Sequence, residues 1–178
     1  YFKECASAID GVFSADKGYD SRHTVLTSLV GVDLDDWAPI FEHYGRGEFQ
    51  TSFDGLMRGA GYMKVWDRKV REAVDRGLRV STISVVNRAL LDDGPDAVLD
   101  YLSELNVAET SWLPFMLNEQ NAATGKYEDF APRMTEWSDF MIALTERWLE
   151  RRRAGLRVPE IGQLRFILRQ RKMSGLAN

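Results

Sequence analysis

Apolar residues follow two different patterns along this chain. Four short runs rich in β-branched and other apolar residues are typical of strands, and they lie near residues 23–29, 48–53, 79–86 and 108–114. The third run, Arg-Val-Ser-Thr-Ile-Ser-Val-Val, is the densest of the four and predicts a buried strand. The chain is therefore expected to form a sheet from four short, separated segments.

Amphipathic segments lie between these runs. The clearest spans residues 61–76, where one face carries Tyr62, Met63, Trp66, Val70, Ala73 and Val74 at steps of three and four residues. Gly77 follows it as a left-handed helix stop. Asp33, with two more carboxylates close behind it, predicts the start of an earlier helix that ends near Gly45.

A later helix is predicted to begin at Asp92 or Asp93, with Pro95 in its first turn, and to end at Asn106. The last two steps from one strand to the next are about thirty residues each, the length of one βα unit. Strands that alternate with helices predict an α/β fold with a parallel sheet and right-handed crossovers. The pattern alone fits either a doubly wound sheet or part of a (β/α) barrel.

After Phe115 the alternation is predicted to end. Residues 118–129 are polar and indicate a loop, and a long helix is expected from about 133 to 153. Its apolar residues recur at alternating steps of three and four, which favours packing over a cofactor site. Pro159 is predicted to open a final helix.

The composition is that of one globular domain, with 178 residues, 44% hydrophobic and 28% charged. No apolar run reaches the roughly 18 residues that a membrane span needs, and no signal-peptide pattern is present. The single cysteine, Cys5, makes no internal disulfide and cannot by itself hold zinc or an iron–sulfur cluster. We therefore expect no membrane partner and a reducing, cytoplasmic location.

Charge is unevenly distributed along the chain. Residues 147–172 hold nine basic and two acidic residues, a net +7 within a chain whose total is −4. Such a segment could bind an acidic peptide or nucleic acid, or it could be an ordinary solvated helix face. The solvated face is the simpler interpretation, so we do not expect a nucleic-acid partner.

Candidate chemistry gathers where strands end, because ligands of parallel α/β folds bind at the carboxyl ends of strands. Ser52 ends the second strand, and Arg58 follows beside two glycines at a helix start, which suits an anion or an ordinary capped turn. Asn87, after the third strand, could read a polar ligand or cap a turn. The fourth strand leads from 112–115 into polar residues 118–121, which could line a cavity or form a solvated loop.

Other familiar sites are absent from the sequence. His23 and His43 have no matching second pair of ligands, which argues against a metal site. Residues 59–61 lack the third glycine of a dinucleotide fingerprint, and neither a nucleophile elbow nor a phosphate-binding loop occurs.

Five blocks in order resemble the radical S-adenosylmethionine (radical SAM) enzymes that carry a C-terminal SPASM domain, which include sulfatase-maturating enzymes and peptide maturases. The blocks span about residues 20 to 170 with their flanks and are Ser52–Gly55, Arg58, Ile83–Asn87, Leu102–Val107 and Leu113–Phe115. Each block is generic by itself, and the order and spacing carry the resemblance.

The resemblance implies a partial (β/α)6 barrel over residues 1–130, followed by a helical extension over 131–178 that leads towards a SPASM-type domain. By position, Ser52 and Arg58 resemble the residues that contact the ribose and the carboxylate of S-adenosylmethionine. Leu113 resembles the residue whose backbone contacts adenine. A complete enzyme would also hold a 4Fe–4S cluster, cleave S-adenosylmethionine reductively, and abstract hydrogen from a substrate such as a peptide or protein side chain.

The chain also departs from the family pattern. The defining Cys-x-x-x-Cys-x-x-Cys and Gly-Gly-Glu motifs are absent, and Ser28 replaces the usual asparagine. We therefore expect a segment truncated at both ends, inactive alone, with no metal ligands of its own. Two other interpretations stay open: a different α/β nucleotide-binding enzyme that uses the turn at 58–61, and a non-catalytic module that binds a partner through its basic helices.

Overall fold

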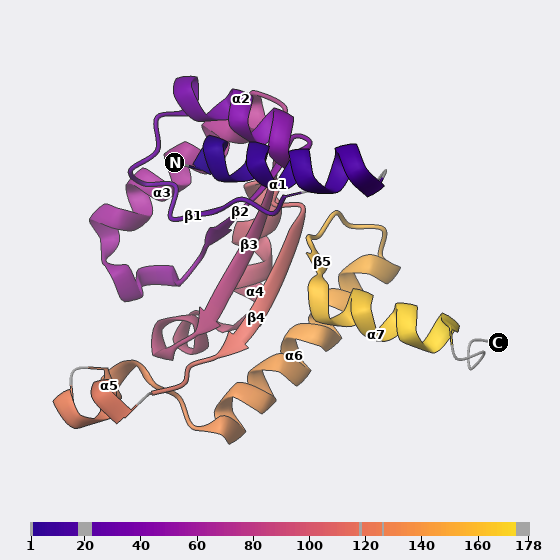
Figure 1. The fold of residues 1–178 in the computed structure, drawn as a ribbon. Helices are drawn as coiled ribbons and strands as arrows, with labels where there is room; N and C mark the ends of the chain where they lie inside the picture. The colour runs from indigo at the N-terminus through magenta and orange to yellow at the C-terminus, as the bar shows by residue number, and fades with distance from the viewer. Residues whose placement is uncertain (1, 18–22, 118, 126, 174–178) are drawn as a thin grey trace.

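A computed structural model describes residues 2–17, 23–117, 119–125 and 127–173. Its five strands form one parallel sheet, and their order in the sheet is their order in the chain (Figure 1). The strands are β1 (Leu26–Thr27), β2 (Glu48–Ser52), β3 (Arg79–Val86), β4 (Glu109–Pro114) and β5 (Glu160–Ile161). The predicted α/β fold with parallel strands is thus confirmed, and the four predicted strands are β1 to β4.

Two strand predictions need correction. β1 is shorter than predicted, because Leu29 takes a left-handed φ of 66° and donates its N–H to the Thr27 hydroxyl at 3.0 Å. The alternation continues past Phe115, since β5 pairs with β4 and its Glu160 N–H donates to Ala108 at 2.9 Å. The predicted helix at Pro159 therefore begins later, after a strand too short to show any periodicity.

The connecting segments are helical. They are α1 (Phe2–Lys17), α2 (Leu34–Gly45), η1 (Gly55–Arg58), α3 (Ala60–Asp75), α4 (Arg88–Glu104), α5 (Glu119–Thr124), η2 (Glu128–Phe130), α6 (Met134–Arg153) and α7 (Gly162–Met173). Asp33 caps α2 as predicted, with its carboxylate accepting from the Asp35 N–H at 2.9 Å. α4 begins earlier than predicted, at Arg88, and is interrupted at Gly94, whose φ of 77° is non-helical.

One face of the sheet is covered by helices and holds the core. Paired residues Phe49 and Val80, and then Thr51 and Thr82, point to this face. Four helices each contribute an aromatic side chain to it: Phe41 of α2 on Phe49, Trp66 of α3 on Thr51, Tyr101 of α4 on Phe53, and Phe140 of α6 on Trp112. Burial of these aromatic side chains, together with the aliphatic residues of the core, stabilises the sheet.

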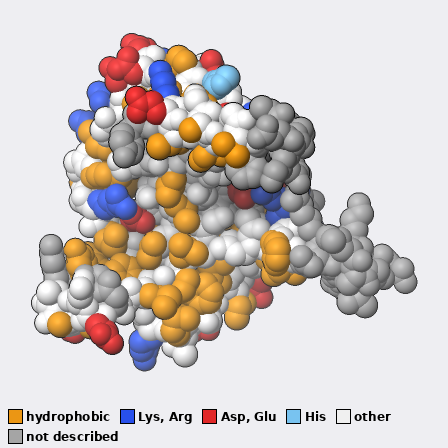
Figure 2. Space-filling model, viewed as in Figure 1, with side chains coloured by type: hydrophobic (Ala, Val, Ile, Leu, Met, Phe, Trp, Pro, Cys, Tyr) orange, Lys and Arg blue, Asp and Glu red, His pale blue; other side chains and the backbone are white. Residues whose placement is uncertain are grey.

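The alternate residues of the same strands point to the opposite face, which we call the open face. It carries Leu26 of β1, Glu48, Gln50 and Ser52 of β2, Ser81, Ile83 and Val85 of β3, and Glu109, Ser111 and Leu113 of β4. Leu26 is 57% exposed and Leu113 is 42% exposed, so these apolar side chains remain uncovered. Figure 2 shows hydrophobic side chains gathered at the surface over the carboxyl end of β4.

Candidate functional site

The carboxyl ends of the strands bring the predicted site residues to one edge of the sheet. Ser52 ends β2 and pairs in register with Ile83, which pairs with Ser111. Leu113 lies two residues beyond Ser111 along β4, and its side chain is on the same open face as that of Ser52. A molecule that contacts both residues would therefore lie across the carboxyl half of the open face.

Arg58 ends η1, the short helix that follows β2. Its Nη2 lies 2.5 Å from Oδ2 of Asp54, and its Nη1 donates to the Tyr62 hydroxyl at 3.2 Å. The guanidinium also lies over the Tyr62 ring, 5.1 Å from the ring centroid, which adds a cation–π contact. Arg58 is therefore held by two partners, and its side chain is still 37% exposed.

Tyr62 links this arginine to the neighbouring strand. Its hydroxyl donates to the backbone carbonyl of Ser28 at 3.1 Å, just beyond the end of β1. Arg58 therefore lies near the carboxyl ends of β1 and β2, in contact with Asp54. This is the edge at which Ser52 ends β2.

Asp54 is buried, with a side chain only 3% exposed. Its Oδ1 accepts weakly from the Val85 N–H at 3.5 Å, and its backbone carbonyl accepts from Asn87 Nδ2 at 2.9 Å. Oδ2 is within ion-pair distance of Arg58 but is not aligned for a hydrogen bond with it. The Arg58 guanidinium thus compensates the charge of Asp54, while Oδ2 of Asp54 accepts no hydrogen bond from the described residues.

The sequence allowed Asn87 either to bind a polar ligand or to cap a turn, and the structure shows the cap. Its side-chain oxygen accepts from the Leu90 N–H at 3.3 Å and caps α4, while its amide donates to Asp54 and Val85. The side chain is fully buried. All of its contacts are internal, so Asn87 positions the Asp54 turn.

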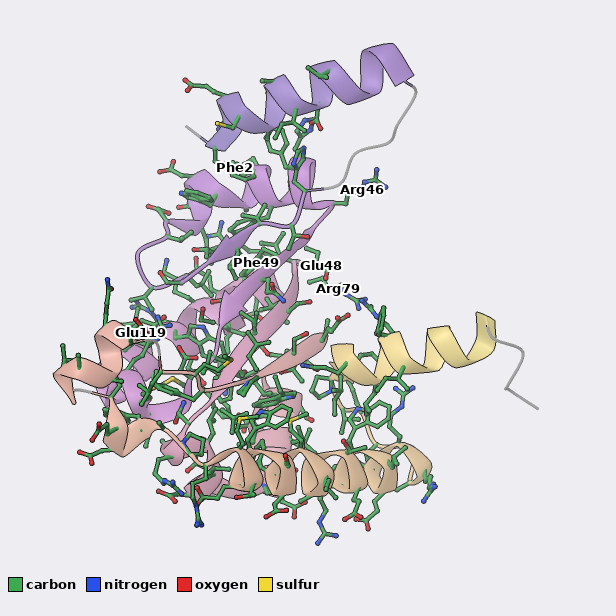
Figure 3. The ribbon with its side chains drawn as sticks, turned by 60° about the horizontal axis from the view of Figure 1, so that its bottom comes forward. Phe2, Arg46, Glu48, Phe49, Arg79 and Glu119 are labelled. Carbon is green, nitrogen blue, oxygen red and sulfur yellow. The ribbon has the colours of Figure 1, made fainter. Side chains whose placement is uncertain are left out.

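The polar segment after β4 was the third candidate site, and its sequence suited either the lining of a cavity or a solvated loop. Asn118 lies outside the described residues. Glu119 and Gln120 begin α5 and are exposed, which fits a solvated segment better than the lining of a cavity. Figure 3 shows Glu119 away from the strands, on the short helix α5.

A polar pocket of about 280 Å³ lies at the amino half of the open face. Glu48 accepts from the Ser81 hydroxyl at 3.0 Å, and Glu109 pairs with Arg165 of α7 at 2.6 Å. Figure 3 shows Glu48 beside Arg79 at this end of the sheet, where the two side chains are 3.5 Å apart. Sequence reasoning missed this group, although polar residues at alternate strand positions were a usable signal.

The residues present do not fit an iron–sulfur cluster. Cys5 is the sole cysteine of the sequence and is exposed on α1. Within the part of the chain that the structure describes, no three His, Cys, Asp or Glu side chains gather as a metal site would require.

Much of the basic C-terminal segment is paired internally. Arg147 and Arg151 of α6 pair with Asp96 of α4, and Arg151 also pairs with Asp100 at 2.8 Å. Arg152 pairs with Glu160 at 2.8 Å. These contacts join α6 to α4 and to β5, which favours a structural role for these arginines over nucleic-acid binding.

Comparison with known proteins adds no family. No protein-family model matches the chain, and no curated protein sequence matches it.

In the described ranges, every helix is too short or too polar to cross a membrane.

Proposed function

We propose that this chain forms part of the barrel of a radical SAM enzyme and holds S-adenosylmethionine at the carboxyl edge of its sheet. The observation that supports the proposal most is the strand order, which is parallel and sequential from β1 to β5. Right-handed crossovers between such strands place every connecting helix on one face. Closure into a barrel is the usual way to enclose the other face.

The same strand order disfavours the rival nucleotide-binding fold. A doubly wound sheet reverses direction at the point where its ligand crevice forms. The sheet here runs in one direction through all five strands that the structure describes. The helices α2, α3, α4 and α6 contact one face, as an arc of a barrel requires. The helix α7, which follows the last strand, instead contacts the open face, at Glu109 and Ser111 of β4.

The side chains at the carboxyl edge suit this ligand. A hydroxyl at Ser52 can bind a ribose, and the guanidinium of Arg58 can offer a fork of N–H donors to a carboxylate. Leu113 would offer backbone groups to adenine from the same face. In the complete enzyme, S-adenosylmethionine held by Ser52, Arg58 and Leu113 would supply the chemistry for abstracting hydrogen from a substrate, here a peptide or protein side chain. The cluster ligands would come from outside this chain.

The complete encoded protein provides the test. After anaerobic reconstitution with iron and sulfide, it is expected to hold a cluster and to form 5′-deoxyadenosine from S-adenosylmethionine under reducing conditions. This chain alone, treated in the same way, is expected to bind no stoichiometric iron, because Cys5 is its only thiol. A complete protein that stays free of iron would contradict the proposal.

A further inference from the structure

A second pocket lies on the helical side of the sheet, between η1, α3 and α4. Its volume is about 340 Å³, at the small end of the range for ligand sites. The apolar lining comes from Phe53, Leu56, Met63, Ala97, Val98 and Tyr101. Phe53 points to the helical face and Ser52 to the open face, so this pocket is separate from the carboxyl-edge site.

The aromatic wall of the pocket is firmly held. Phe53 is buried and stacks on Tyr101, with 5.7 Å between ring centroids. The Tyr101 hydroxyl donates to Asp67 Oδ2 at 3.0 Å. Burial and this bond to Asp67 raise the pKa of Tyr101, so the ring stays neutral in ordinary conditions.

The interruption of α4 places one carboxylate at the pocket. Gly94, with φ 77° and ψ 163°, separates the first turns of α4 from the helix that continues at Pro95. Asp93, just before this break, lines the pocket, and its Oδ2 lies 4.0 Å from the position that a β-carbon on Gly55 would take. Asp93 is the single charged residue in the described lining, and no described residue forms an ion pair with it.

We propose that this pocket binds a small hydrophobic cation, such as an arylalkyl amine. The apolar body of the ligand packs against Tyr101 and Met63, and its ammonium group lies beside Asp93. Aromatic walls favour cations, whereas the carboxylate repels anions of the same shape. A neutral ligand of that shape gains the apolar contacts and leaves Asp93 without a partner.

Calorimetric titration of the full chain tests this site with phenethylamine and with its neutral analogue 2-phenylethanol. We expect saturable binding of the amine, and weaker binding of the alcohol. Asp93→Asn should weaken amine binding about two- to fivefold, the scale of an exposed ion pair, and leave alcohol binding unchanged. Asp92→Asn is the matched control, because Asp92 is an exposed neighbour that does not line the pocket, and it should bind the amine like the wild type.

A second variant tests the location of the site. Ala97 is exposed on α4, so Ala97→Leu suits the helix and should fold, which far-UV circular dichroism checks. Its larger side chain should abolish binding of both ligands. Equal affinity of the wild type for amine and alcohol, full amine binding by Ala97→Leu, or no saturable binding of the amine in the millimolar range would each overturn the proposal.

Discussion

The guanidinium of Arg58 lies 2.5 Å from the carboxylate of Asp54. The Arg58 side chain is partly exposed, whereas the Asp54 side chain is buried. A buried carboxylate without a counter-charge is costly, so this pair stabilises the turn after β2. The same contact holds the guanidinium at the carboxyl edge of the sheet. Arg58 therefore stabilises the fold, and its partly exposed guanidinium is the group that we propose binds an anion.

Arg58→Ala is expected to destabilise the chain by about 1–3 kcal/mol, less than a fully buried pair would lose, because Arg58 is partly exposed. The cause is the uncompensated charge that remains on Asp54. The double variant Asp54→Asn with Arg58→Ala should recover part of this loss, since it removes that charge. Urea unfolding measures both effects, and a double variant as unstable as the sum of the two single variants would contradict this explanation.

Gly162→Ala should loosen the contact between α7 and β4. A β-carbon at Gly162 would lie 2.6 Å from the Ser111 hydroxyl and 3.0 Å from Glu109 Oε1, so these two side chains must shift away from α7. We expect a loss of about 1–2 kcal/mol in unfolding free energy.

Gly61→Ala is the control for that substitution. Gly61 lies in the first turn of α3, and no atom within 4 Å would meet its β-carbon. Alanine should therefore stabilise the chain by about 0.5 kcal/mol, through its better helix propensity. Equal effects of alanine at Gly61 and Gly162 would show that the contact with β4 does not matter.

The ion pair between Arg88 and Glu136 should make stability depend on pH. Hydrogen bonds from the Arg88 side chain and then from the Arg133 backbone lower the pKa of Glu136 from 4.5 to about 2. The carboxylate therefore stabilises the folded state above pH 4.5, and this contribution is lost as the pH falls towards 2. Glu136→Gln should be less stable than the wild type at neutral pH, and the difference should shrink in acid.

Unfolding at several pH values and fixed ionic strength measures this difference. Asp139→Asn is the control, because Asp139 is an exposed carboxylate on the same helix. A gap between wild type and Glu136→Gln that stays constant from neutral pH to pH 2 would contradict the assignment.

The parallel fold was predictable because its signals are local. β3 is a run of eight residues dense in β-branched side chains, α3 shows its helical period over sixteen residues, and Asp33 caps α2 where its sequence position predicts. β5 was not predictable, because two residues show no period and its pairing with β4 depends on distant residues. The break at Gly94 was also missed, since Gly-Pro fits a helix start as well as an interruption.

The candidate site was predictable in part. Alternation along β2 and β4 places Ser52 and Leu113, once the register is known, on one face. The partners of Arg58 lie four residues away on either side, so their spacing was a usable local signal. The bond from Tyr62 to Ser28 was not predictable, because it spans 34 positions of sequence. Glu48 and Glu109 were missed because their pocket forms only when β2, β3, β4 and α7 assemble.

Calorimetric titration of the complete, reconstituted protein with S-adenosylmethionine tests the central claim most directly. Arg58→Ala should weaken binding by about 1.5–3 kcal/mol, which is roughly ten- to a hundredfold, with no change in iron content. Arg68→Ala, which removes an exposed arginine on α3, should bind like the wild type. A dissociation constant unchanged by Arg58→Ala would contradict the account and leave Arg58 with its structural role beside Asp54 alone.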